Sequence, residues 1–413
     1  NLTDNPLYPT SPMELLIKQY PTILINITAS PFDYDHDDDR KEIILANIKH
    51  YHLPILYCNT VGAQTEIVFD GGSLVFNNTG GLNKELKYFE EDFYVFDSSE
   101  LINQQTEPYH LIETRASRLK NREQILESLT TEKNIIQIYH ALLLGIRDYF
   151  KKMGFKKAIL GASGGIDSAI VQVLAVRALG KENVHALLMP SEFSSSHSVS
   201  DAEQLAANLE HSFDIVPIKE IYDSYIKSLK SLFYNLPFGI AEENIQSRIR
   251  GNLLMGLSNK FGYILLNTSN KSELAVGYGT LYGDMAGGLS VLGDVYKMQI
   301  YALAKFINKT DEIIPVNILN KAPSAELRPE QLDSDSLPEY IMLDKVLYEY
   351  IEMRRSHSEM VATGFDAALV SRIIKLVTKA EYKRNQFCPI IRVSRKAFGI
   401  GRRIPIVSKI NDQ

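Results

Sequence analysis

The chain has 413 residues, of which 45% are hydrophobic and 23% charged, and a formal net charge of −6. This composition is typical of a globular protein of two or three domains, and the acidic balance argues against wholesale nucleic-acid binding. The sequence holds two cysteines, Cys58 and Cys388, which excludes a disulfide framework, and no apolar run reaches the length of a membrane span. We therefore predict a cytoplasmic protein with no nucleic-acid partner and no membrane partner.

Residues 1–97 alternate short apolar and polar segments, which predicts part of a layered α/β domain. We expect helices over 13–20 and 40–51, a buried strand over 22–26, and further strands over 54–59, 66–69, 73–76 and 93–96. The turn residues at 70–72 predict a hairpin. Residues 98–134 are polar, charged and weakly periodic, so we expect a linker there.

From residue 135 onward, apolar strands alternate with amphipathic helices. We expect helices over 135–150, 169–179, 201–208, 244–261 and from 339 to about 378, and strands before residue 161 and over 184–189, 213–216 and 263–267. Strands that are apolar on both faces and alternate with helices predict a parallel, doubly wound sheet. Ligands bind such sheets beyond the carboxyl ends of the strands.

A glycine-rich turn follows the first of these strands and reads Gly161-Ala162-Ser163-Gly164-Gly165-Ile166-Asp167-Ser168. Its glycines let backbone amides approach a ligand, and the next helix adds unpaired N–H groups and the positive end of its dipole. We therefore expect a cradle for phosphate. The Asp167 carboxylate would repel a bare phosphate, which indicates a bridging Mg²⁺ ion. The alternative is an ordinary strand–turn–helix corner.

No Lys follows the glycine turn, so the Walker A pattern is absent. A phosphate loop without that Lys suits a pyrophosphate that leaves as a unit. Positions 163–168, in their strand–turn–helix setting, resemble the PP-loop ATP pyrophosphatases. The resemblance implies an adenine nucleotide alpha hydrolase-like fold and cleavage of ATP between its α- and β-phosphates, which adenylates a substrate.

Five further stretches, in order along the chain, resemble the NAD⁺ synthetases. They are residues 243–250, 267–273, 283–288, 321–327 and 381–384. The resemblance implies that ATP adenylates the carboxylate of nicotinate adenine dinucleotide (deamido-NAD⁺), and that ammonia then displaces AMP to give NAD⁺. It also implies Mg²⁺ as cofactor, ATP as co-substrate and a homo-oligomer.

The family's motifs also imply roles for individual residues. The implied ATP contacts are Gly161, Ala162, Ser163, Gly164, Gly165, Ile166, Asp167, Ser168, Thr268, Lys297 and Ser324. The implied deamido-NAD⁺ contacts are Asn244, Arg248, Glu273 and Lys383, and the implied Mg²⁺ ligands are Asp167 and Glu273. Ordinary explanations compete: Asn244 and Arg248 also fit a solvated helix face, and Glu273 fits the first turn of a helix.

The chain resembles the glutamine-dependent synthetases, since Leu281 and Gly288 replace the basic and acidic residues of ammonia-only enzymes. Residues 27–32 and 59–73 accordingly resemble part of a nitrilase-type α/β/β/α glutaminase domain, in which a Cys nucleophile acts with Glu and Lys. This resemblance implies a glutamine contact at Ser30.

We expect the glutaminase triad to be absent from this chain. The family's Cys falls at about residues 2–4, where the sequence reads Leu2, Thr3 and Asp4, and its Glu and Lys fall further upstream. Cys58 suits packing better than nucleophilic attack, and His36 stands where the family has Lys. We expect synthesis driven by free ammonia and none by glutamine, and we expect the sequence to omit an N-terminal portion.

The expected domains are a partial glutaminase half over 1–97, the linker, and a synthetase half over 135–413. Three other functions stay open: another PP-loop amidotransferase of GMP or asparagine synthetase type, a nitrilase-like amidohydrolase with a nucleotide-sensing domain, and a non-catalytic ATP-binding scaffold. Residues 243–250 and 321–327 weigh against the first. The lack of a recognisable nucleophile and base in the first hundred residues weighs against the second.

Overall fold

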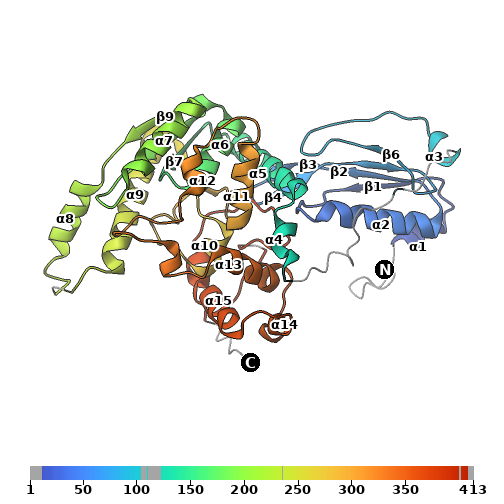
Figure 1. The fold of residues 1–413 in the computed structure, drawn as a ribbon. Coiled ribbons are helices and arrows are strands. Elements are labelled where there is room, and N and C mark those ends of the chain that lie inside the picture. The colour runs from blue at the N-terminus through green and yellow to red at the C-terminus, as the bar shows by residue number, and fades with distance from the viewer. Residues whose placement is uncertain (1–11, 104–108, 110–121, 235, 400, 408–413) are drawn as a thin grey trace. The chain divides into compact units, whose positions relative to one another are not determined.

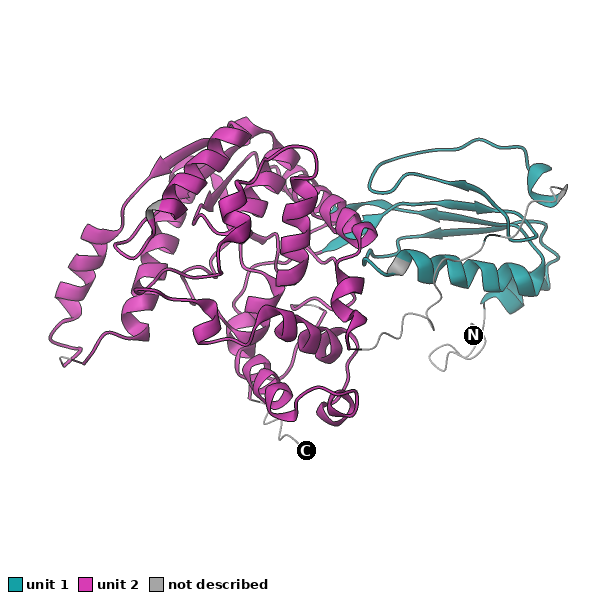
Figure 2. Ribbon diagram, in the orientation of Figure 1, with its two compact units in different colours: residues 1–63, 67–120 teal, residues 64–66, 121–413 magenta. Residues whose placement is uncertain are grey.

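The chain divides into two units in a computed structural model that describes residues 12–103, 109, 122–234, 236–399 and 401–407. Unit 1 comprises residues 1–63 and 67–120, and unit 2 comprises residues 64–66 and 121–413 (Figure 2). Each unit is compact, and each is considered by itself. No helix in the described part of the chain is long and apolar enough to cross a membrane.

Unit 1 is built from short strands and one long helix (Figure 1). Its elements are α1 (Pro12–Ile17), β1 (Leu24–Thr28), α2 (His36–Tyr51), β2 (Ile55–Asn59), β3 (Val61–Gln64), β4 (Ile67–Asp70), β5 (Leu74–Phe76), β6 (Leu82–Glu85) and α3 (Glu100–Asn103). Among the described residues, a sheet has the order β1-β2-β5-β6, and only the β1–β2 pair is parallel. Helix α2 packs Ile44 and Ile48 against Ile55, Tyr57 and Phe76 of this sheet.

The hairpin expected around residues 70–72 is wrong, because β4 pairs with β3 while β5 pairs with β2. Gly71 and Gly72 have φ angles of 68° and 58°, a region that glycine adopts at low cost. A Cβ on Gly72 would lie 2.2 Å from the ring of Tyr88. These glycines therefore carry the chain from one sheet to the other instead of folding it back.

Two strand expectations in unit 1 also differ from the structure. Residues 93–96 are not a strand, and the sheet ends instead at β6, whose sequence is mostly polar and carries no alternating pattern. The first strand forms as β1, but it is not buried, since Ile25 and Ile27 are 66% and 82% exposed. Apolar composition predicted the strand there, but not which of its faces is covered.

Unit 2 alternates strands and helices over most of its length. Its strands are β7 (Lys157–Gly161), β8 (Val184–Leu188), β9 (Ser212–Ile215), β10 (Tyr263–Asn267) and β11 (Leu289–Ser290). Its helices are α4 (Gln124–Leu129), α5 (Glu132–Met153), α6 (Ile166–Leu179), α7 (Ser196–Leu209), α8 (Lys219–Leu229), α9 (Ile240–Phe261), α10 (Lys271–Val276), α11 (Lys297–Ile307), α12 (Val316–Asn320), α13 (Tyr340–Leu347), α14 (His357–Ala362), α15 (Ala367–Lys379) and α16 (Glu381–Arg384).

The described strands of unit 2 pair in the order β11-β10-β7-β8-β9, and each of these pairs is parallel. Helices α8 and α9 cover one face of the sheet, and α5, α6, α7 and α11 cover the other (Figure 1). Alternate strand residues serve the two faces: Ile159 and Leu187 pack toward α9, whereas Ala186 and Leu188 pack toward α7. The expected doubly wound α/β fold is confirmed.

Strand β7 lies at the point where the strand order reverses, with β8 on one side and β10 on the other. The crevice at such a point, beyond the carboxyl ends of the strands, is where open α/β sheets bind ligands. The glycine turn leaves β7 at this edge, and residues 268–270 leave β10 beside it. The fold therefore brings two distant sequence motifs to one place.

The helical tail expected from residue 339 to about 378 is made of α13, a π-helical turn over Tyr348–Glu352, α14 and α15. Ser356 accepts a hydrogen bond from the Glu359 amide, and Asp366 accepts one from the Leu369 amide. These side chains cap the starts of two new helices, which periodicity alone does not reveal.

Candidate active site

The β7–α6 turn is held open by its own side chains. The Ser163 Oγ accepts a hydrogen bond from the Gly165 amide at 3.2 Å and lies 3.2 Å from the Ser168 Oγ. Gly164 has φ of 75°, and a Cβ there would lie 2.2 Å from the carbonyl oxygen of Ser198 on α7. Only glycine fits this position, because both the backbone angle and the close approach exclude a side chain.

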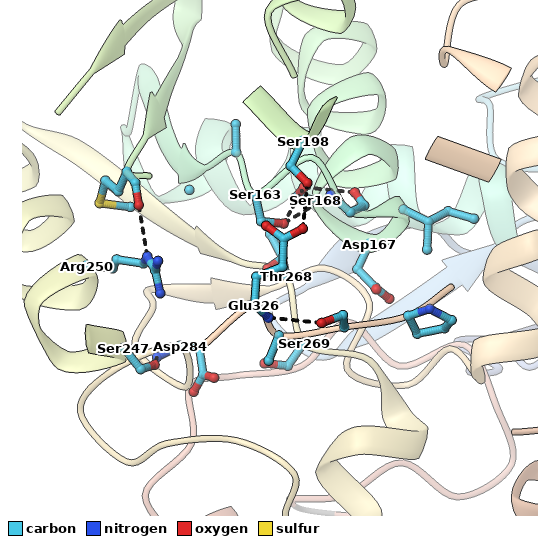
Figure 3. A pocket seen from close by; sticks show the side chains of 18 of the residues that line it. Ser163, Asp167, Ser168, Ser198, Ser247, Arg250, Thr268, Ser269, Asp284 and Glu326 are labelled. Carbon is cyan, nitrogen blue, oxygen red and sulfur yellow. Dashed lines mark hydrogen bonds between the residues drawn. The ribbon is translucent and has the colours of Figure 1, made fainter. Parts of the chain in front are cut away.

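A cavity of about 290 Å³ opens at this edge of the sheet (Figure 3). Of the implied ATP contacts, all but Gly164 line it, and so does the implied Mg²⁺ ligand Glu273. Those residues are Gly161, Ala162, Ser163, Gly165, Ile166, Asp167, Ser168, Thr268, Lys297 and Ser324. Further parts of the wall come from the ends of β8 and β10, from α7 and α9, and from residues 278–286, 321–327 and 333.

Asp167 and Glu273 meet at Lys297, although they lie on different helices. The Lys297 Nζ lies 2.5 Å from Asp167 Oδ2 and 3.4 Å from Glu273 Oε1. Asn270 joins the same cluster: its Oδ1 accepts from the Glu273 amide at 2.9 Å, and its Nδ2 donates to Asp167 Oδ1 at 3.0 Å. The cap of α10 therefore also orients the carboxylate of the glycine turn.

This cluster shifts the protonation equilibria of its members. Desolvation, together with the negative charges of Asp167 and Asp333, raises the pKa of Glu273 to about 8, although Lys297 opposes the change. Burial alone would lower the pKa of Lys297, but the Asp167 and Glu273 carboxylates outweigh it and raise that pKa. The raised pKa of Glu273 indicates that a second ionised carboxylate beside Asp167 is costly here unless a further cation approaches it.

The donor set fits a magnesium ion that also holds phosphate. No group of three or more His, Cys, Asp or Glu side chains suited to a metal ion occurs among the described residues. Mg²⁺ in nucleotide enzymes, however, takes one or two carboxylates, and waters and phosphate oxygens complete its shell. Asp167 and Glu273 supply two such carboxyl groups beside the phosphate loop, and both line the cavity.

Asn244, Arg248 and Lys383, which the resemblance implies as dinucleotide contacts, do not line the cavity. They gather instead at the backbone segment 277–281. Asn244 Oδ1 accepts from the Thr280 hydroxyl at 2.7 Å, and Arg248 Nε donates to the Leu281 carbonyl at 3.2 Å. Lys383 Nζ donates to the carbonyls of Gly277 and Gly279 at 2.8 and 2.7 Å. The three side chains thus shape a loop whose neighbours, Tyr278, Gly283 and Asp284, line the cavity.

The segment 321–327 adds polar groups that the sequence analysis did not single out. Lys321 Nζ lies 2.5 Å from Glu326 Oε1, and this carboxylate also accepts from the Ser198 hydroxyl at 2.8 Å. The Ser324 hydroxyl, an implied ATP contact, donates to the Gln331 carbonyl at 2.5 Å and accepts from the Glu326 amide. The motif at 321–327 was recognised as a unit, but its Lys and Glu carried no separate signal.

Asp333 is a further cavity-lining carboxylate that the sequence analysis missed. It accepts hydrogen bonds from the hydroxyls of Tyr278 and Tyr340 at 3.1 and 2.8 Å. Its sequence, an acidic loop between helices, resembles any solvated turn. The fold places Asp333 close enough to Glu273 for its negative charge to raise the pKa of Glu273.

A buried network behind the cavity fixes the start of α11. Asp344 Oδ1 accepts from the Ser272 hydroxyl at 2.5 Å, and Asp344 Oδ2 accepts from the Met298 amide at 2.9 Å. The Lys297 amide donates to the same Ser272 oxygen at 3.0 Å. Burial raises the pKa of Asp344 to about 7, although these hydrogen bonds oppose the rise. Asp344 thereby helps to set where the Lys297 side chain begins.

In unit 1, the candidate glutamine contact Ser30 lies beside a polar cluster. Its amide donates to Asn59 Oδ1 at 2.9 Å, and Asn59 donates to Asp70, which Arg40 holds at 3.0 Å. His36 begins α2. The positions where the family's nucleophile is expected, residues 2–4, lie outside the described residues.

The two cysteines lie in different environments. Cys58 is exposed on β2, and burial raises the pKa of the Cys388 thiol to about 12. A nucleophilic thiolate needs a neighbouring base or cation that lowers its pKa. The Cys388 thiol therefore does not suit nucleophilic attack.

A parallel sheet with a Ser-Gly-Gly turn at its switch point, and paired carboxylates beside that turn, defines the PP-loop class of α/β proteins. Within that class, residues 138–387 match the family model described as NAD synthase. The glutamine-dependent NAD(+) synthetase of Synechocystis sp. is 43% identical over 410 residues, which are 98% of this chain and 70% of the relative. That of Thermotoga maritima is 40% identical over 426 residues, or 99% and 73%.

A solved structure agrees with these relatives. The glutamine-dependent NAD⁺ synthetase from Acinetobacter baumannii, in complex with ADP, matches with a TM-score of 0.66 at 37% identity. The match covers 97% of this chain and 70% of that chain. The chain belongs to the NAD synthase family and is a ligase.

Proposed function

We propose that unit 2 catalyses the ATP-dependent amidation of deamido-NAD⁺ to NAD⁺ through an adenylated carboxylate. A carboxylate oxygen attacks the α-phosphorus of ATP, and the bond from that phosphorus to the bridging oxygen of the β-phosphate breaks. Pyrophosphate leaves with that electron pair. Ammonia then attacks the acyl carbon, AMP leaves with the bond electrons, and the nitrogen loses a proton to give the amide.

The observation that carries the proposal is the meeting of Asp167, Glu273 and Lys297 beside the glycine turn. The backbone amides of the turn and of the first turn of α6 would receive the pyrophosphate as it leaves, with Lys297 as a further cation. Ser163, Thr268 and Ser324 would orient the remainder of ATP as hydroxyl contacts.

Asp167 and Glu273 would hold a Mg²⁺ ion, which supplies neutralising charge to the polyphosphate when bound. Lys297, which contacts both carboxylates, would supply a further cation to the phosphates. The raised pKa of Glu273 supports this assignment, because a nearby cation would favour its ionised form. The two carboxylates orient the ion, and Asn270 in turn keeps Asp167 in position.

The loop held by Asn244, Arg248 and Lys383 is proposed as the wall against which the dinucleotide binds. The three side chains bond to the same loop although they come from α9 and α16. Because these hydrogen bonds fix the backbone of the loop, it can present a constant surface to a large, flexible substrate. A dinucleotide bound against this loop would also reach Glu273, which lines the cavity.

Substrate scanning tests the function. Purified chain with Mg²⁺, ATP and ammonium should form NAD⁺, AMP and pyrophosphate in equal amounts when deamido-NAD⁺ is the acid. Xanthosine monophosphate and aspartate, the acids of the rival amidotransferases, should give no product. Product from either of them, or ATP binding without any turnover, would favour the rival enzyme or the scaffold.

Unit 1 is proposed as part of a nitrilase-like glutaminase domain, with Ser30 as a glutamine contact, and unit 2 as the synthetase domain. We propose that ammonium supports NAD⁺ synthesis by this chain and that glutamine does not. Parallel assays with the two nitrogen donors decide this. Equal rates with glutamine and ammonium would contradict this proposal. The Cys58→Ser variant would then test whether the exposed Cys58 thiol carries the glutamine-dependent activity.

The chain is further proposed to act in the cytoplasm as a homo-oligomer. Multi-angle light scattering of the purified chain, at several concentrations, tests the oligomeric state. A single monomer mass at all concentrations would contradict it.

A further inference from the structure

Arg250 is a cation of the cavity wall for which neither the motifs nor the described contacts supply a counter-charge. It lies on α9 and lines the cavity together with its neighbours Ser247 and Gly251. Its Nε donates to the Met189 carbonyl at 3.0 Å, just beyond the end of β8. In the described part of the chain its two terminal nitrogens have no hydrogen bond and no carboxylate within ion-pair distance.

The hydrogen bond from Nε to the Met189 carbonyl fixes the direction of the guanidinium. Because Nε is held by a backbone carbonyl at the rigid edge of the sheet, the planar group cannot rotate freely about its stem. Arginine offers a fork of N–H donors that matches the two oxygens of a carboxylate or phosphate. Here that fork is oriented in advance and left open.

The electrostatics show that the protein itself does not complete the charge. Desolvation lowers the pKa of Arg250 to about 10, and the more distant charges of Asp284 and Glu326 oppose this only in part. A guanidinium removed from water costs free energy unless an anion approaches it. A structural arginine in such a place would normally be paired with a carboxylate, as Arg384 is with Glu381 at 2.7 Å.

The position of Arg250 complements the Lys297 cluster. Figure 3 shows Arg250 and Asp167 toward opposite sides of the cavity, with Ser163 and Thr268 between them. Met189 and Leu254 give the cavity an apolar wall near Arg250. One positive group therefore stands at each end of a cavity in which two anionic substrates have to meet.

We propose that the terminal nitrogens of Arg250 bind an anionic oxygen group of one of the two substrates, a phosphate of ATP or an acid group of deamido-NAD⁺. This inference rests on the proposed function and adds a substrate-binding residue to it. Binding at Arg250 would bring the charge of one substrate into the desolvated part of the cavity, where attack on the α-phosphorus has to occur.

Kinetics of Arg250→Met and Arg250→Lys test the proposal, with Arg147→Met, an exposed arginine of α5, as the matched control. For Arg250→Met we expect kcat/KM to fall at least about 10-fold for one substrate, as is usual when a charged binding partner is lost. Calorimetric titration of Mg·ATP alone identifies the source: weakened ATP binding points to a phosphate of ATP. Unchanged ATP binding with a raised KM for deamido-NAD⁺ points to the dinucleotide.

Arg250→Lys supplies a readout that a purely structural role would not produce, and it remains available if the Met variant fails to fold. A lysine in this desolvated position should lose its proton at a lower pH than arginine. Its rate relative to the wild-type protein should therefore decline between pH 7 and 9, while the Arg147→Met rate follows the wild type. Values of kcat and of both KM within twofold of wild type, with no new alkaline limb, would overturn the proposal. If the wild-type chain itself makes no NAD⁺, the proposed function fails instead.

Discussion

The ammonium of Lys297 lies 2.5 Å from the carboxylate of Asp167, a residue on another helix and at the other side of the switch point. Lys297 is almost fully buried, with 3% of its side chain exposed, whereas 18% of the Asp167 side chain is exposed. A buried ion pair of this kind contributes little to stability by itself, because desolvation offsets the attraction. Under the proposed function, its value is that two charges used to bind the nucleotide are already oriented.

Replacing Asp167 by asparagine should abolish most of the reaction while the fold persists. Asparagine keeps the size of the side chain, but it removes a charge that would hold Mg²⁺ and leaves Lys297 with Glu273 alone. We expect pyrophosphate release to fall at least about 10- to 100-fold, the loss usual when even a supporting group of a metal site is removed. Pyrophosphate release as a function of Mg²⁺ concentration measures this.

Asp335→Asn is the matched control, because it removes the same charge outside the cavity. Asp335 is 41% exposed and pairs with Arg328 at 3.0 Å, and exposed ion pairs of this kind contribute little to stability. Its variant should release pyrophosphate at the wild-type rate. Wild-type kinetics and Mg²⁺ dependence in Asp167→Asn would mean that the metal site lies elsewhere.

Gly164→Ala should disrupt the glycine turn. The added methyl group would meet the Ser198 carbonyl at 2.2 Å on a backbone with φ of 75°, so the turn has to move. We expect ATP affinity, measured by calorimetric titration, to fall at least about 10-fold, since the amides of the turn leave their positions. A wild-type affinity would show that these amides do not bind the nucleotide.

Gly256→Ala provides the opposite control within α9. A Cβ at Gly256 meets nothing within 4 Å. Alanine lowers the entropy cost of a helix interior, so this variant should be more stable by about 0.5–1 kcal/mol, with unchanged ATP binding. Chemical denaturation of Gly164→Ala, Gly256→Ala and the wild type measures the free energy of unfolding of each. The comparison separates the steric clash at Gly164 from the general effect of replacing a glycine by alanine.

The motifs that predict the candidate site are local in the sequence. The glycine turn and the segment 268–273 each follow a strand, and parallel strands bring their carboxyl ends to one edge. The contribution of Asp333 and Arg250 could not be seen in this way. Asp333 lies in a polar loop, and Arg250 differs from Arg248 only by which side of α9 faces the cavity. Both depend on packing between segments distant in sequence.

In unit 1, less could be predicted, for the same reason. The sequence around Gly71 and Gly72 predicts a hairpin, because it shows a turn between two short strands. It does not show that these strands, β4 and β5, pair with other strands instead of with each other. The ring of Tyr88 occupies the space where a Cβ of Gly72 would lie, a close approach that the local sequence does not show. The strand β6 was missed because a short, half-exposed strand needs no apolar alternation.

Lys383→Met tests the proposed wall of the dinucleotide site. The substitution removes two hydrogen bonds, to the carbonyls of Gly277 and Gly279, but keeps the aliphatic stem. We expect KM for deamido-NAD⁺ to rise about 10-fold, which corresponds to a loss of about 1.4 kcal/mol, with KM for ATP within twofold of wild type. Lys379→Met, an exposed residue at the end of α15, should leave both values unchanged. An equal rise in both KM values would mean that Lys383 supports the whole cavity and not the dinucleotide.

Asp344→Asn should change how stability depends on pH. Burial raises the pKa of Asp344 from 3.8 to about 7, so between these values the native protein keeps a proton that the unfolded chain has lost. The stabilisation from this group is complete below pH 3.8 and is lost as pH rises through about 7. Asparagine does not titrate, so the stability of the variant does not fall in this way as pH rises.

The thermal midpoints of the two proteins, compared at pH 5 and at pH 8, measure the effect. The variant should gain on the wild type as pH rises, because every other titrating group is common to both and cancels. Asp311→Asn, which removes an exposed aspartate, should show the same difference from wild type at both pH values. A pH-independent difference for Asp344→Asn would show that Asp344 stays ionised throughout, held by Ser272 and the Met298 amide at the start of α11.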